Sequence, residues 1–171
     1  MILIENISGL DLTIHPQSVL IKVKAQFAQS PKLKKWFNDL LEKKNKSNDD
    51  KIVEEKITID DILTGEEINV KMKIFKRPSC MFQSQGQTKW KGVFRGSWEG
   101  LEDKSIGLGS CRFEASWLSS DSSDEETAAE LVIHELAHWV EAYSLGKIWP
   151  NKPKNIGYDT GDYVIKKFVR W

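Results

Sequence analysis

One stretch, Ala129 to Glu141, constrains this chain more than any other part of its sequence. It contains His134-Glu135-Leu136-Ala137-His138, in which two histidines are four residues apart and an acid directly follows the first. On an α-helix, residues four apart lie one turn apart on the same face, so both imidazoles can bind one metal ion. The stretch therefore predicts a helix that carries two metal ligands, His134 and His138, with Glu135 close enough to act as a general base.

The residues around this stretch favour a long helix. Ser123 and Glu126 fit a capping box, in which a serine at the start and a glutamate three residues later accept hydrogen bonds from free backbone N–H groups. Gly146 and Pro150 follow, as is typical beyond the end of a helix. We therefore expect one helix from about residue 123 to residue 145.

The composition is that of an ordinary folded domain. With 171 residues, 40% of them hydrophobic and 29% charged, residues 1–171 are predicted to form a single domain. The 25 basic residues balance the 25 acidic ones, so net charge gives no reason to expect a polyanionic partner.

Targeting and redox features point to the cytoplasm. No apolar run approaches the roughly 20 residues needed to span a bilayer, so no membrane partner is expected. The first residues lack the basic leader and long apolar core of a signal peptide. Cys80 and Cys111 are too few for a disulfide framework, and we expect them to be reduced, buried thiols.

The N-terminal third is predicted to combine strands with one clear helix. Residues 2–7 are typical of a short apolar strand, and the alternation from Val19 to Phe27 favours a second strand, although Val23 and Phe27 also fit a helix. Ser30-Pro31 then opens a helix whose apolar stripe is Leu33, Trp36, Phe37, Leu40 and Leu41.

Four further segments are rich in alternating or β-branched residues: 52–59, 67–75, 88–94 and 105–113. Glycines and acidic turns separate them, so they predict an antiparallel sheet of three to five strands that packs on the His134 helix. Residues 164–171 are expected to form a short closing helix. The predicted fold class is therefore α+β.

Two of these strands also suggest binding functions. Residues 89–98 interleave basic residues with Trp90, Phe94 and Trp98, which can stack on nucleic-acid bases but equally fit a half-exposed strand. Residues 105–113 contain Gly107 and Gly109, and such a strand can bind an extended peptide by edge pairing or simply contain a bulge.

A catalytic zinc ion usually takes three protein ligands and leaves one position for water. Two acids downstream of the helix, Asp159 and Asp162, are candidates for the third ligand. Asp159 can equally be a turn former and Asp162 a helix cap, and both roles are compatible if Asp159 binds the metal and Asp162 caps the last helix.

The His134-Glu-Leu-Ala-His138 element, preceded by a sheet segment and an acidic helix start, resembles the zincin metallopeptidases. Residues 105–171 look most like the compact SprT-like group and other minimal zincins. Proteins of the SprT-like group usually take a third histidine from a His-Gly element before a closing helix. Here Asp159-Thr160-Gly161-Asp162 occupies that place without a histidine. The resemblance implies a zincin-like fold and Zn²⁺ as cofactor. Because the family's histidine is missing, Asp159 is the predicted third ligand.

The resulting functional hypothesis is zinc-dependent hydrolysis of peptide bonds by a metal-activated water, with Glu135 as general base and a peptide or protein as substrate. The alternative is a catalytically silent zincin-like binding or structural module, with nucleic acid as a further partner through residues 89–98. The substrate and the oligomeric state stay open.

Overall fold

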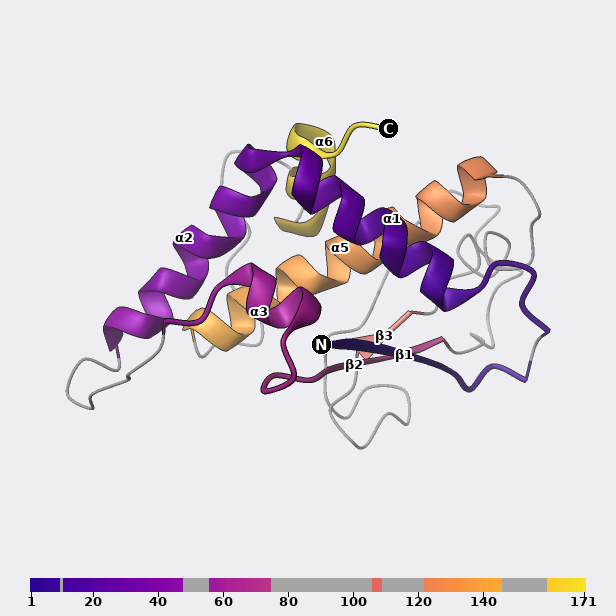
Figure 1. Ribbon diagram of the computed structural model, residues 1–171, viewed down its shortest axis with the longest axis horizontal. Helices are drawn as coiled ribbons and strands as arrows, with labels where there is room; N and C mark the ends of the chain where they lie inside the picture. The colour runs from indigo at the N-terminus through magenta and orange to yellow at the C-terminus, as the bar shows by residue number, and fades with distance from the viewer. Residues whose placement is uncertain (10, 48–55, 75–105, 109–121, 146–159) are drawn as a thin grey trace, which may run out of the picture.

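The structure is a computed structural model that describes residues 1–9, 11–47, 56–74, 106–108, 122–145 and 160–171. Its elements are shown in Figure 1. In chain order they are β1 (Ile2–Asn6), α1 (Pro16–Gln29), α2 (Pro31–Ser47), α3 (Ile59–Thr64), β2 (Val70–Ile74), β3 (Ile106–Gly107), α5 (Ser122–Leu145) and α6 (Thr160–Phe168). The described part of the chain is therefore predominantly helical.

The sheet is small and parallel, so the predicted antiparallel sheet of three to five strands is wrong. Its strand order is β1-β2-β3, and both pairings are parallel, with Ile2 opposite Val70 and Met72 opposite Ile106. The physical reason is the connection between β1 and β2, which contains three helices. Parallel neighbours need such a long crossover, whereas antiparallel neighbours can be joined by a hairpin. The described fold consequently gives no support to a zincin-like sheet.

The segment Val19–Phe27 is the middle of helix α1, so the predicted strand there is wrong. A strand would place Ile21 and Val23 on the same face, but Ile21 is 68% exposed and Val23 is 0% exposed. Instead Val19, Val23 and Phe27, each four residues apart, are all buried. This spacing buries one face of a helix, and Pro16 at its first turn starts it.

Helix α2 confirms the predicted helix after Ser30. The backbone N–H of Leu33 donates a hydrogen bond of 3.2 Å to the Ser30 side-chain oxygen, as expected of an N-cap. Leu33, Phe37 and Leu41 are completely buried, and the Phe37 ring meets the Phe27 ring edge to face at 5.0 Å. Helices α1 and α2 therefore join in one core.

We expect Ser30→Ala to lower the free energy of unfolding by about 1 kcal/mol, because the Leu33 N–H loses its cap in a partly buried place. Urea denaturation should show a lower midpoint with an unchanged m-value. Ser18→Ala, inside α1, is the matched control and should cost nothing, since alanine is the better helix former. Equal losses for both variants would contradict the capping role.

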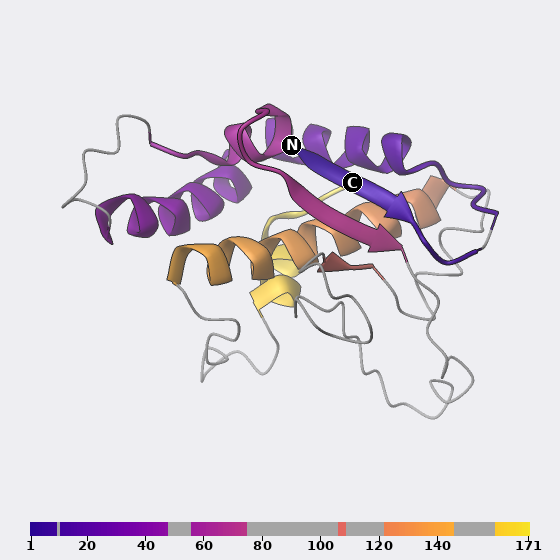
Figure 2. The ribbon, with the colours of Figure 1, turned by 90° about the horizontal axis from the view of Figure 1, so that it is seen from below.

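Helix α5 is confirmed as a long helix and is the centre of the fold. It packs against α1, α2 and α6, and Figure 2 shows it lying between α1 and α6. A helix covered by neighbours is apolar on most of its surface, and its most deeply buried apolar residues are Ala128, Ala129, Leu131, Val132, Ile133, Leu136, Ala137 and Val140. The His134 motif thus belongs to a helix that is packed on several sides.

Helix α6 confirms the predicted closing helix but begins earlier than predicted, at Thr160. Asp162 therefore lies in the first turn of α6 and is not its N-cap residue. Its far end is tied to α1. The Gln26 side-chain amide donates to the Arg170 carbonyl oxygen at 2.6 Å, and its oxygen accepts from the Arg170 N–H at 3.2 Å. Because Gln26 is buried, both bonds are shielded from water.

Several predictions concern other parts of the chain. The predicted strand 52–59 is wrong at its end, because Ile59 begins helix α3. Cys80, Cys111, the aromatic segment 89–98 and Asp159 lie outside the described residues. No helix in the described part of the chain is long and apolar enough to cross a membrane.

Candidate metal centre

His134 and His138 lie side by side on α5. Their ring centroids are 4.9 Å apart, with an angle of 64° between the ring planes. Two imidazole nitrogens that bind one tetrahedral zinc ion at about 2.1 Å place their ring centroids roughly 5 Å apart. Both side chains are partly exposed, so solvent can reach them. The separation and the nitrogen donors therefore fit a shared zinc ion.

Glu135 lies on one side of the His134 ring. Its carboxylate oxygen Oε1 is 3.7 Å from Nε2 of His134, and its side chain is 0% exposed. The carboxylate is thus next to the nitrogen through which a helical histidine can reach a metal ion. A general base must lie near water at the metal ion, and Glu135 meets this need in its distance to Nε2 although its side chain is completely buried.

Asp162 lies on the other side of the same ring. Its Oδ1 atom is 3.4 Å from Nδ1 of His134, and its side chain is 52% exposed. The two nitrogens of His134 therefore face two different acids, Glu135 from α5 itself and Asp162 from α6. A metal ion on the Nε2 side leaves Asp162 beside the nitrogen that does not bind the metal.

Gly161 brings α6 against the His134 ring. A Cβ atom at Gly161 would lie 2.5 to 2.6 Å from ring atoms of His134, closer than such atoms approach. Only glycine therefore allows this contact between the two helices. No role for Gly161 was predicted from the sequence, because the close contact joins two helices that are separated in the chain.

The described residues do not complete a three-ligand metal site around the two histidines. Within the described ranges, no group of three histidine, cysteine, aspartate or glutamate side chains lies close enough together to hold a metal ion. His15, the remaining histidine of the chain, is exposed just before α1. The predicted ligand Asp159 directly precedes Thr160 in the sequence but lies outside the described residues.

An aromatic pair follows the motif on α5. The rings of Trp139 and Tyr143 stack with centroids 4.8 Å apart and an angle of 11° between planes. Burial raises the pKa of the Tyr143 phenol above its ordinary value, so this side chain stays neutral at neutral pH. The pair therefore supplies apolar surface to the core beside the histidines, not a charge.

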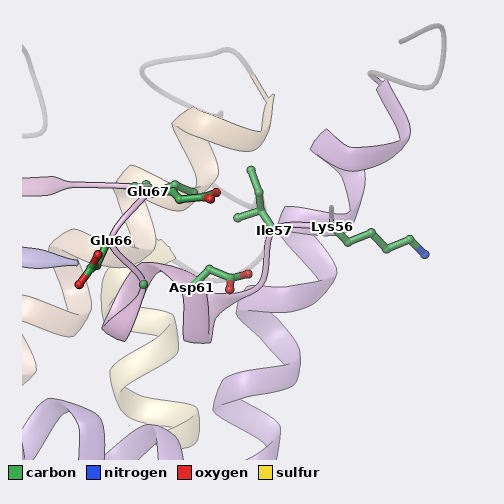
Figure 3. Close-up of a pocket in the computed structure, with 7 residues that line it drawn as sticks. Lys56, Ile57, Asp61, Glu66 and Glu67 are labelled. Atoms are coloured by element: carbon green, nitrogen blue, oxygen red, sulfur yellow. The ribbon is translucent and has the colours of Figure 1, made fainter. Parts of the chain in front are cut away.

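The structure also contains a hollow away from the histidines. It is lined by residues 56–57, 61 and 65–68, none of which belongs to α5 or α6. Figure 3 shows the Lys56 side chain extending away from the acids of this hollow. The Asp61 carboxylate already accepts hydrogen bonds from the Thr58 N–H at 2.7 Å and the Thr58 hydroxyl at 3.0 Å. The hollow is thus separate from the candidate metal centre.

No family model, no curated protein and no solved structure matches this chain. A functional assignment therefore depends on the residues of the candidate centre and their geometry.

Proposed function

We propose that this protein is a zinc-dependent peptidase that hydrolyses peptide bonds. The observation that carries the proposal is the arrangement on α5: two imidazoles 4.9 Å apart, with the Glu135 carboxylate 3.7 Å from Nε2 of His134. Two nitrogen ligands with an acid beside them form the working part of a hydrolytic zinc site. The proposal includes Asp159 as third ligand and a cytoplasmic location.

Each residue has a defined task in this reaction. His134, His138 and Asp159 would hold zinc, which supplies Lewis acidity when bound. Glu135 takes a proton from the attacking water and passes it to the leaving amine.

The proposal is tested by measuring metal content and proteolysis together. We expect about one zinc ion per chain by mass spectrometry, proteolysis of an unfolded protein substrate, loss of proteolysis on chelation and recovery when zinc is returned. His138→Ala should abolish both the bound zinc and the activity. The proposal would be contradicted if the wild-type protein, first loaded with zinc and then freed of unbound zinc by dialysis, retained none.

One observation favours a second function. Glu135 is completely buried, although a general base must meet water and substrate. This suits a metal-stabilised binding or structural module, in which zinc contributes folding energy without chemistry. In that case the same experiment gives one tightly held zinc ion, a large fall in melting temperature on chelation and no proteolysis of any substrate in a broad panel.

A further inference from the structure

We propose that Asp162 is a positioning residue for His134. It holds the imidazole through Nδ1, so that Nε2 is directed towards the metal ion. This assigns Asp162 neither to the metal nor to the cap of α6, the two roles that the sequence suggested. The inference depends on the proposed function insofar as His134 is a zinc ligand.

The contacts on the two sides of the ring support this assignment. Asp162 Oδ1 is 3.4 Å from Nδ1 of His134, whereas Glu135 Oε1 is 3.7 Å from Nε2. A neutral imidazole carries its proton on one nitrogen and binds metal through the other. A carboxylate beside Nδ1 keeps the proton there, leaves the Nε2 lone pair for the metal and makes it a stronger ligand.

The position of Asp162 is fixed from both directions. On its N-terminal side, Gly161 lies against the His134 ring, with no space for a side chain between them. On its C-terminal side, α6 runs to the segment that Gln26 binds through the N–H and carbonyl of Arg170. The attachment of α6 therefore brings Asp162 next to the His134 ring, where its carboxylate lies 3.4 Å from Nδ1.

The test compares Asp162→Ala, Asp162→Asn and Asp124→Ala in the full chain. Asp124 is also an acid in the first turn of a helix, but it is ten residues, or roughly 15 Å, from His134 along α5. Zinc affinity is measured by competition with a chromophoric chelator. We expect Asp162→Ala to weaken zinc binding by about 10- to 100-fold and Asp124→Ala to leave it unchanged. Asp162→Asn keeps an oxygen acceptor and should recover part of the loss.

A second measurement does not require metal. Nitrogen NMR of the zinc-free protein, at a pH where the ring is neutral, reports which nitrogen of His134 carries the proton. We expect the proton on Nδ1 in the wild type and in Asp124→Ala, and a mixture of both forms in Asp162→Ala. Circular dichroism of each variant confirms that the helices are retained.

The outcomes separate this inference from the proposed function. If the wild type binds zinc and Asp162→Ala binds it equally tightly with the same proton position, Asp162 has no positioning role, while the metal site stands. If the wild type binds no zinc but its His134 proton moves in Asp162→Ala, the proposed function fails and the contact with Nδ1 is real. A fall in melting temperature alone, equal in Asp162→Ala and Asp124→Ala, marks a purely structural role and overturns the inference.

Discussion

Glu135→Gln is expected to lower the rate of peptide hydrolysis by about 10²- to 10⁴-fold while one zinc ion per chain is retained. The amide has nearly the shape of the carboxylate, so it preserves the packing of α5 around this fully buried position. It cannot accept a proton, however, and the water loses its base. Initial rates on a quenched peptide library, measured beside the zinc content of the same sample, give the result.

Glu130→Gln is the matched control for this variant. Glu130 is on the same helix, and its carboxylate accepts a hydrogen bond of 2.9 Å from the Trp171 indole N–H, which an amide oxygen can also accept. This variant should therefore keep both zinc and activity. If zinc-loaded Glu135→Gln hydrolysed peptides as fast as the wild type, Glu135 would not be the general base.

Gly161→Ala should disturb the metal centre from the opposite helix. The added methyl group would overlap ring atoms of His134 at 2.5 to 2.6 Å, so either the imidazole turns away or α6 moves outward. We expect zinc affinity to fall by about 10- to 100-fold and the hydrolysis rate by about 100-fold, because small displacements of a reacting group have large effects. Overpacking should also reduce stability, by about 1–3 kcal/mol.

Gly65→Ala is the control that separates the loss of stability from the loss of zinc affinity in Gly161→Ala. A Cβ at Gly65 would lie 2.4 Å from the Asp61 carbonyl oxygen at the end of α3, so it also produces overlap, but away from the histidines. This control should lose stability and keep zinc affinity at temperatures well below its melting point. Gly161→Ala with normal zinc affinity would show that α6 does not support His134.

The helices with distinct local signals were predictable from the sequence. Ser30 and Pro31 mark the start of α2, and its apolar stripe fits only a helical period. In α1 the signals conflict, because Ile21 extends an apparent strand alternation although it is 68% exposed in the structure. An exposed isoleucine cannot be recognised as exposed from its neighbours in the sequence, and this residue led to the wrong prediction.

Strand direction was not predictable in the same way. The segments that form β1 and β2 have the composition of strands, and they pair from Ile2 with Val70 to Asn6 with Ile74. The parallel direction follows from the crossover through α1, α2 and α3. The antiparallel sheet was predicted from segments 52–59, 67–75, 88–94 and 105–113 alone, whereas β2 pairs with β1 at the start of the chain.

In the candidate metal centre too, contacts within one helix were predictable and contacts between helices were not. The spacing of His134 and His138 is a local property of one helix, so their proximity follows from the sequence alone. The contacts of His134 with Gly161 and Asp162 join two helices that are separated in the chain. No local pattern encodes such a contact. From the sequence alone, Asp162 was predicted only as a candidate metal ligand or a helix cap.

The hydrogen bonds between Gln26 and Arg170 join residues that are 144 positions apart in the chain. Contacts of such sequence separation are slow to form, because the entropy of closing a long loop must be overcome first. During synthesis, α5 with both histidines leaves the ribosome before α6. A nascent chain can therefore present His134 and His138 early, but it completes their surroundings only when α6 is made and docked. If the two histidines bind zinc as proposed, tight binding would follow the docking of α6.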